Sequence, residues 1–145
     1  MSKESLSQYL DMVKRHIQEI EEFPMKYAFS EEQLQEALKQ LGAKREECIS
    51  FYGCIMKKSD IPKYKEMCAK QEAEIRKALK NEEFAKEAFR YEMDNHEYAI
   101  NWEGDENVLS SLYIDWNFVE ENHLENAYSE AKREHMIQME EKGFI

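Results

Sequence analysis

A β-rich segment, Cys48-Ile49-Ser50-Phe51-Tyr52-Gly53-Cys54-Ile55-Met56, sets the fold class of a sequence that is otherwise helical in pattern. β-branched and aromatic residues stand on both sides of Gly53, which is typical of two strands joined by a tight bend. Upstream, the segment Met25-Lys26-Tyr27-Ala28-Phe29 alternates in the way expected of a further short strand. These two segments predict a small antiparallel sheet of two or three strands.

The rest of the sequence predicts five or so helices, so the expected fold is α+β and predominantly α-helical. Apolar residues recur every three or four positions from Ser2 to Glu22, and Pro24 ends that helix. Ser30 and Gln33 have the spacing of a capping box, and Gly42 suits the end of the helix that they open. Further helices are expected to start at Ser59 or Asp60, at Asn81, at Asp105, and at Asp115 or Asn117.

The length of 145 residues fits a single compact domain, residues 1–145. Hydrophobic residues make up 42% of the chain, which is enough for a packed core and argues against disorder. No apolar run approaches the ~18–20 residues of a membrane-spanning helix, and the first residues lack a signal-peptide pattern. We therefore expect a soluble, cytoplasmic protein with reduced thiols at Cys48, Cys54 and Cys68, whose spacing matches no metal or redox motif.

The net charge of −11 is distributed unevenly along the chain. Residues 1–80 carry 15 Lys and Arg and 14 Asp and Glu, whereas residues 81–145 carry 5 and 17. The first part therefore has a net charge of +1 and the second a net charge of −12. An acidic surface of this kind would repel nucleic acid, whose binding depends on cationic side chains, and would attract a basic protein surface.

The excess of acids predicts a partner-binding surface between Glu82 and Glu125. Two tryptophans lie among these acids and are candidate anchors, because aromatic residues are enriched at binding hot spots. The predicted contact residues are Glu82, Glu83, Glu87, Asp94, Trp102, Glu103, Asp105, Glu106, Trp116, Glu120 and Glu121. The alternative is that these acids only keep the protein soluble, which is a common role of net charge.

Motifs that carry chemistry are weak throughout the sequence. Glu92 and His96 share one helix face at i,i+4 spacing, but a metal site needs further ligands, which helical spacing does not supply. The four histidines are scattered with no local signature that joins one to a cysteine, and the four glycines form no phosphate-binding loop. The sequence therefore predicts a protein that is not an enzyme, with no catalytic residue, no cofactor and no metal.

Three segments resemble an uncharacterised family of short phage and prophage proteins. They are Tyr27-Ala28-Phe29-Ser30-Glu31-Glu32-Gln33-Leu34, Tyr52-Gly53-Cys54-Ile55-Met56-Lys57-Lys58-Ser59-Asp60 and Tyr91-Glu92-Met93-Asp94-Asn95-His96-Glu97-Tyr98-Ala99-Ile100. The resemblance implies a phage-related setting and brings no known catalytic residues. Small acidic phage proteins are often similar in role to inhibitors of host defence, including anti-CRISPR proteins that imitate the charge of nucleic acid.

Two functions from different classes follow. The first is inhibition of a nucleic-acid-binding host defence protein, whose basic surface the acidic side chains would contact; the sequence leaves open whether the protein forms a homodimer. The second is binding or sequestering a small ligand, with pocket walls formed by the turn at Gly53 and by the segment from His96 to Trp102. That segment has weak helical periodicity and is expected to form a turn or a short strand.

Overall fold

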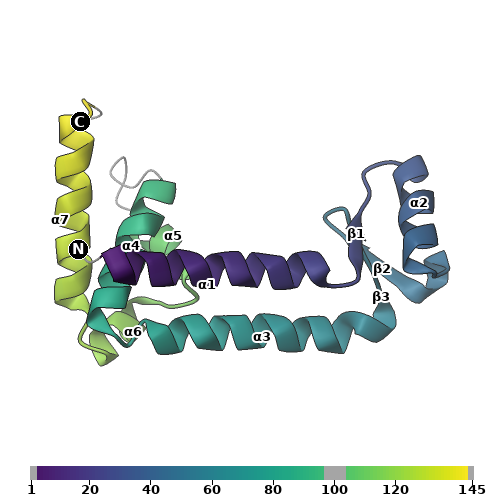
Figure 1. Ribbon diagram of the computed structural model, residues 1–145, viewed down its shortest axis with the longest axis horizontal. Helices are drawn as coiled ribbons and strands as arrows, with labels where there is room; N and C mark the ends of the chain where they lie inside the picture. Colours follow the sequence, from purple (N-terminus) through teal and green to yellow (C-terminus); the bar gives the residue numbers. More distant parts are fainter. Residues whose placement is uncertain (1–2, 97–103, 144–145) are drawn as a thin grey trace. The chain divides into compact units, whose positions relative to one another are not determined.

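The computed structural model describes residues 3–96 and 104–143, which contain seven α-helices and one three-stranded antiparallel sheet (Figure 1). In chain order the elements are α1 (Lys3–Glu22), β1 (Met25–Tyr27), α2 (Glu31–Leu41), β2 (Cys48–Phe51), β3 (Cys54–Lys57), α3 (Ile61–Ala78), α4 (Glu82–Asn95), α5 (Gly104–Ser111), α6 (Trp116–Glu121) and α7 (Glu125–Glu141). The prediction of a mainly helical α+β fold with a small sheet is confirmed. The helices are more numerous than expected.

The additional helix arises because the C-terminal segment, expected to be one helix, forms α6 and α7. Asp115 caps α6 through its side chain, which accepts a hydrogen bond from Phe118 N at 3.0 Å. His123 then adopts a left-handed backbone with φ of 56°, which a continuous helix does not allow. Asp105 was expected to cap α5, but α5 already includes Gly104, so Asp105 lies within its first turn.

The chain forms two compact units. Residues 15–70 make up one, called here the sheet unit, and residues 1–14 and 71–145 make up the other, called the helical unit. The sheet unit is thus an insertion between two parts of the helical unit, and α1 and α3 each contribute residues to both. A single domain of residues 1–145 stays a prediction, because compactness does not show whether the two units unfold together.

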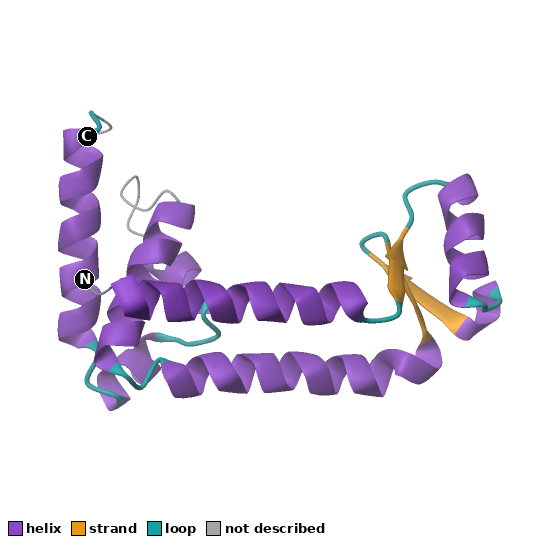
Figure 2. Cartoon of the chain, in the orientation of Figure 1, coloured by secondary structure: helices purple, strands orange, loops and turns teal. Residues whose placement is uncertain are grey.

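The sheet unit is organised by a tight hairpin whose strands are β2 and β3. Tyr52 and Gly53 form the turn with φ of 50° and 81°, the positive values of a type I′ turn. β3 lies at the centre of the sheet, with β1 antiparallel on its other side, and α2 packs against β1 and β3 (Figure 2). Ser30 caps α2 by accepting from Gln33 N, and Gly42 ends it with φ of 64°, as the sequence predicted.

The two faces of the sheet differ in what covers them. Met25 and Met56 are opposite each other on β1 and β3, and with Cys54 they form a small core that includes Phe23 and Tyr64. Ile55 points to the opposite face because side chains alternate along a strand. Ile55 is 3% exposed and faces the side where α2 packs.

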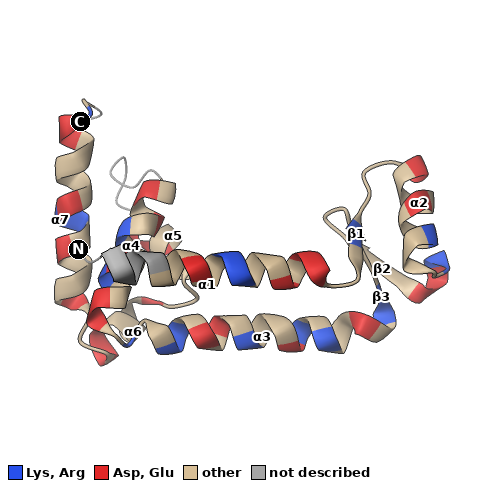
Figure 3. Ribbon diagram, in the orientation of Figure 1, with Lys and Arg blue, Asp and Glu red and all other residues tan. Residues whose placement is uncertain are grey.

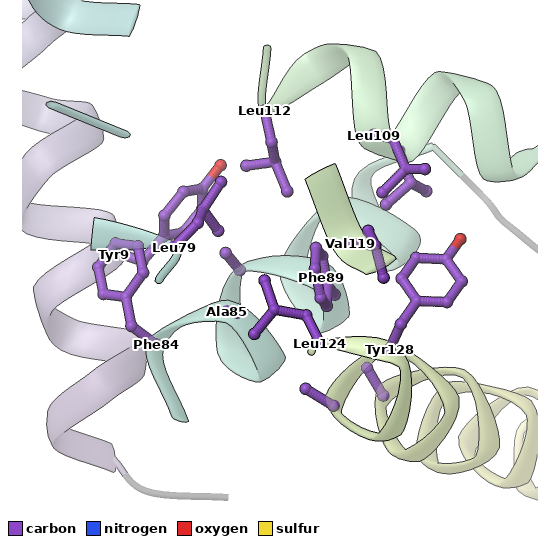
Figure 4. Close-up of a cluster of buried hydrophobic side chains, with 14 of the residues drawn as sticks. Tyr9, Leu79, Phe84, Ala85, Phe89, Leu109, Leu112, Val119, Leu124 and Tyr128 are labelled. Atoms are coloured by element: carbon purple, nitrogen blue, oxygen red, sulfur yellow. The ribbon is translucent and has the colours of Figure 1, made fainter. Parts of the chain in front are cut away.

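The helical unit encloses a larger core, which is built around α4. Its buried residues come from α1 and from α3 through α7, with α4 packed mainly against α7 (Figure 4). Asn81 caps α4 through a hydrogen bond from Phe84 N to its Oδ1 at 2.9 Å, as predicted. Phe89, 0% exposed, lies edge-to-face with Tyr128 on α7, with ring centroids 5.1 Å apart. Aromatic contacts of this geometry add to the free energy gained from burial.

Candidate functional site

Charge separates between the two units. The sheet unit, residues 15–70, carries ten Lys and Arg and ten Asp and Glu, so its net charge is zero. The whole net charge of −11 therefore belongs to the helical unit. Figure 3 shows both acidic and basic residues on α2. The accessible acids of the helical unit are for this reason the candidate site.

The basic residues of α4 contact mainly α7, and Arg90 Nε also lies 3.9 Å from Oδ1 of Asp94, one of the accessible acids. Lys86 Nζ lies 3.0 Å from Glu130 and 3.1 Å from Glu134, and Arg90 Nη1 lies 3.5 Å from Glu134. Their side chains are only 18% and 16% exposed. The hydrogen bond to Glu130 raises the pKa of Lys86, so this cation stays charged and committed to α7.

A groove in the helical unit combines acids with an aromatic side chain. It has a volume of about 570 Å³ and is formed by α5, the α5–α6 connection and the start of α6. We call it the acidic groove. Its lining residues are Asp105, Glu106, Asn107, Leu109, Ser110, Ile114, Asp115 and Trp116.

Trp116 is fixed at the edge of the acidic groove. Its ring is edge-to-face with Tyr128, with centroids 5.5 Å apart, and the residue remains 42% exposed. Tyr128 in turn donates a hydrogen bond from its hydroxyl to Asp105 Oδ1 at 2.5 Å. A tryptophan held beside carboxylates can stack on a guanidinium or ammonium group while the carboxylates neutralise its charge. The groove is therefore chemically suited to an arginine or lysine side chain.

Most of the predicted contact residues are accessible in the structure. Exposed positions are held by Glu82, Glu83, Asp94, Glu106, Trp116, Glu120 and Glu121. Asp105 is half-buried against Tyr128, and Asp94 Oδ1 lies 2.7 Å from Nδ1 of the buried His135. Trp102 and Glu103 lie outside the described residues, as does most of the segment expected to form a turn or strand after His96.

Glu87 is not on the surface where its predicted contact role would place it. It is 1% exposed, and within the described part of the chain neither carboxylate oxygen has a hydrogen-bond partner. Burial raises the pKa of this carboxyl, because the charged form loses hydration. The position follows from helical geometry, since Glu87 is flanked by the buried pair Ala88 and Phe89 and lies three residues after Phe84. Glu87 therefore cannot contact a partner from its place in the fold.

A second polar cluster joins Tyr9 on α1 to α4. The Tyr9 hydroxyl donates to Glu92 Oε1 at 2.5 Å, and His96 Nε2 lies 3.4 Å from Glu92 Oε2. Burial, followed by the hydrogen bond to Glu92, raises the pKa of Tyr9, so the phenol stays protonated. The sequence predicts that Glu92 and His96 share one helix face, and in the structure their side chains are close enough to form an ion pair. Across residues 3–96 and 104–143, no group of three or more His, Cys, Asp or Glu is placed to hold a metal ion.

The sheet unit contains a different kind of cavity, between α2 and the sheet. Gly53, a wall of the ligand pocket predicted from the sequence, lines this cavity, whose volume is about 550 Å³. We call it the sheet-unit pocket; its other lining residues are Ala28, Phe29, Ser30, Glu31, Leu34, Leu38, Arg45, Cys48, Ile49, Ser50 and Ile55. His96, the start of the other predicted wall, belongs to the helical unit.

A family model described as a family of unknown function, DUF7659, matches residues 8–134. The chain belongs to this family. The expectation of an uncharacterised family is confirmed at that level, and the match includes residues of both units. No curated protein and no solved structure matches the chain. The family description names no activity, so the phage setting and the inhibitory role implied by the resemblance stay predictions.

The helices bear on membrane insertion. In the part of the chain that the structure describes, none of them combines the length and the apolar character needed to cross a bilayer. The three cysteines are free thiols, with Cys54 buried and Cys48 and Cys68 half-buried. Reduced, partly buried thiols were the expectation from their spacing.

The sequence does not indicate several residues that line the acidic groove and the sheet-unit pocket. The sequence predicts Asp115 only as a helix cap. In the structure its position directly before Trp116 also places a carboxylate at the edge of the acidic groove. In the sheet-unit pocket, Phe29 and Leu34 were read only as parts of a strand and a helix. The spacing of Ser30 and Gln33 is the available signal, because it predicts the start of α2, which packs against β1 and β3.

Proposed function

We propose that the protein binds the basic surface of another protein through the acids of its helical unit. In the finer form of the proposal, it is a phage-type inhibitor that occupies the nucleic-acid-binding surface of a host defence protein and imitates the charge of nucleic acid. The observation that carries the proposal is the confinement of the entire net charge of −11 to one unit. Charge concentrated in this way accelerates association with a basic partner.

The local arrangement of side chains supports the same proposal. Within the described residues, Lys86 and Arg90 form ion pairs with acids of α7 and with Asp94, and not with the exposed acids at the start of α4 and the end of α6. Trp116 supplies an apolar surface among carboxylates, which is the composition of a contact that accepts cationic side chains. The exposed acids would accelerate the approach of a basic partner, and the acidic groove would select a cationic side chain on that partner.

The experiment begins with capture of partners from host lysate at two salt concentrations, followed by association kinetics with each purified partner. The test variant reverses Glu82, Glu83, Glu120 and Glu121 to lysine. A matched control reverses Glu21, Glu22, Glu32 and Glu46, which are exposed acids of the sheet unit, and so changes the net charge equally. We expect the test variant to associate at least about tenfold more slowly at low salt, and the control to change much less. Equal rates for the two variants would contradict the proposal, because they would show that only total charge matters.

A direct test of nucleic-acid imitation uses competition. If the protein covers a nucleic-acid-binding surface, it should displace labelled duplex DNA or single-stranded RNA from the captured partner, and the test variant should displace it poorly. Simultaneous binding of the protein and the nucleic acid would remove the inhibitory form of the proposal while leaving basic-surface binding in place.

A second candidate function is binding or sequestering a small ligand, and the sheet-unit pocket is the observation that favours it. Its volume lies within the usual range for small-molecule sites. A thermal-shift screen with nucleotides, metal ions and apolar compounds would test this function, since a ligand that binds only the folded state raises the melting temperature. A hit should lose its effect when Leu34, which lines the pocket, is replaced by Gln.

A further inference from the structure

The sheet-unit pocket has a floor of fixed apolar side chains. Leu38 from α2 and Ile55 from β3 are 7% and 3% exposed, so their positions are set by packing of the helix on the sheet. The lining of the pocket comes from α2, from both strands of the hairpin and from neighbouring connections. A preformed apolar floor costs little reorganisation when a ligand binds, which favours affinity.

Phe29 forms an exposed wall of the pocket and is held against the hairpin turn. It is 78% exposed, yet its ring lies so close to Gly53 that a Cβ at this glycine would be 2.3 Å from Phe29 Cε1. The backbone N–H of Phe29 donates to Gln33 Oε1 at 2.7 Å, which also fixes the residue at the start of α2. A large phenyl ring is thus held in place while most of its surface meets water, and an apolar ligand would cover that surface.

Charge at the pocket is balanced. Among the described residues that line it, Glu31 and Arg45 are the only acidic or basic ones, and Arg45 Nη2 lies 2.8 Å from both carboxylate oxygens of Glu31. Burial raises the pKa of the Cys48 thiol, so this group remains neutral at physiological pH. The hydroxyl of Ser30 accepts the helix-capping bond from Gln33 N. A charged ligand would therefore meet a lining without net charge, because Glu31 and Arg45 neutralise each other.

We propose that the sheet-unit pocket binds an uncharged, mainly apolar small molecule that packs against Phe29 and Leu34 above the Leu38–Ile55 floor. This inference rests on the second candidate function and names the ligand class for it. The volume of about 550 Å³ and the absence of net charge among the lining residues that the structure describes favour a small neutral ligand over a nucleotide or a peptide rich in charge.

The test uses N-phenyl-1-naphthylamine, an uncharged aromatic probe whose fluorescence rises in apolar sites, with the full-length protein. We expect saturable binding at one site per chain. Phe29→Ala and Leu34→Gln should each weaken binding about tenfold or more, because each removes apolar contact with the probe. Tyr52→Asn is the matched control: Tyr52 is 97% exposed, lies outside the pocket lining, and has a backbone φ of 50° that asparagine tolerates. Circular dichroism verifies that each variant remains folded.

A second readout locates the probe independently of fluorescence. Cys48 lines the pocket and Cys68 does not, and both are half-buried thiols. Saturating probe should slow modification of Cys48 by N-ethylmaleimide, measured by peptide mass spectrometry, and should leave the rate at Cys68 unchanged. This protection should disappear in Phe29→Ala.

Three results would overturn the proposal in distinguishable ways. Binding of the probe that Phe29→Ala and Leu34→Gln leave unchanged would show that the pocket is not the site. Binding of a nucleotide or of anilinonaphthalene sulfonate, lost in the same variants while the neutral probe fails to bind, would overturn the ligand class and leave the second candidate function standing. A concentration-dependent dimer that Phe29→Ala dissociates would show that another copy of the chain covers Phe29 instead.

Discussion

The helical unit and the sheet unit of the same chain present opposite kinds of surface. Among the described residues, the main core of the helical unit contains sixteen buried apolar residues, and this unit carries the entire net charge. The main core of the sheet unit contains three, and this unit is neutral. Its exposed large apolar residues include Ile17, Tyr27, Phe29, Ile49, Phe51 and Tyr52.

The difference indicates two modes of recognition. Electrostatic attraction acts over distances of about a Debye length, ~8–10 Å at physiological salt, whereas apolar surfaces stabilise a complex only after they touch. The helical unit is therefore suited to steering a charged partner, and the sheet unit is suited to holding an apolar group in place. A large core also allows the helical unit to tolerate self-repulsion among its acids, because burial offsets that cost.

The largest expected effect comes from the core of the helical unit. Phe89→Ala removes a fully buried ring that packs on Tyr128, and we expect it to lower the free energy of unfolding by about 3–5 kcal/mol. Urea unfolding followed by circular dichroism would measure this loss. A loss below about 1 kcal/mol would contradict the packing described for this core.

The same variant shows whether the units are one domain. α1 and α3 contribute to both cores, for example through Tyr9 and Ile20 on α1. If residues 1–145 unfold as a single domain, Phe89→Ala should lower amide hydrogen-exchange protection in the sheet unit as well as in the helical unit. Loss of protection confined to the helical unit would establish two domains.

Glu87 tests the cost of a buried acid in the charged unit. Glu87→Met should stabilise the protein at neutral pH by about 1–3 kcal/mol, because it removes a buried carboxyl with no hydrogen-bond partner among the described residues. Glu83→Met, on the exposed side of the same helix, is the control and should change stability by less than about 0.5 kcal/mol.

The pH dependence of the Glu87→Met effect has a defined sign. Burial raises the pKa of Glu87 in the folded state, so the folded protein binds more protons than the unfolded chain above the ordinary glutamate pKa of about 4.3. Stability of the natural sequence should therefore fall as the pH rises from that value through the raised pKa. The advantage of Glu87→Met should be smallest in acid and should grow as the pH rises through the raised pKa. A pH-independent advantage would contradict the raised pKa.

Each unit has a helix cap whose loss should have a smaller effect on stability. Asn81 caps α4 in the helical unit, and Ser30 caps α2 in the sheet unit. Replacing either by alanine should cost about 1 kcal/mol, and Asn81→Gly should cost only a few tenths. We expect Asn81→Ala to lower the midpoint of global unfolding, whereas Ser30→Ala should mainly increase hydrogen exchange in α2. An unchanged midpoint for Asn81→Ala would show that α4 does not depend on its cap.

Local signals explain which parts of the fold could be predicted. Caps and turns are set by neighbours in sequence, so Ser30, Gly42, Asn81 and the bend at Gly53 were predicted at their observed positions. The break between α6 and α7 at His123 was not predicted, because a left-handed histidine has no strong sequence signature and the flanking residues suit a helix.

The candidate site could be predicted only in outline. An excess of acids is visible in composition, but which acids are accessible depends on the helix packing. The sequence predicts Glu87 as a surface acid, although it is buried. The sequence also does not predict that Lys86 and Arg90 form ion pairs with α7. The division into a neutral unit and an acidic one was also hidden, because residues 1–14 and 71–80 join the helical unit through tertiary contacts.

The smallest predicted effect uses two matched ion pairs on α3. Glu66 and Lys70 lie 3.1 Å apart in the sheet unit, while Glu72 and Arg76 lie 3.8 Å apart, with the same i,i+4 order, in the helical unit. Glu66→Gln should cost about 0.3–0.5 kcal/mol at low salt, the usual value for an exposed helical pair. Glu72→Gln breaks a similar pair, but it also removes one acid from the unit that carries the entire net negative charge. The loss of stability should therefore vanish or become a small gain. Thermal unfolding at low and high salt would measure both variants, and the difference between them should disappear as salt screens the charges. Equal costs at low salt would mean that the excess charge of the helical unit is too dispersed to act on α3, and the same dispersion would weaken its attraction for a basic partner.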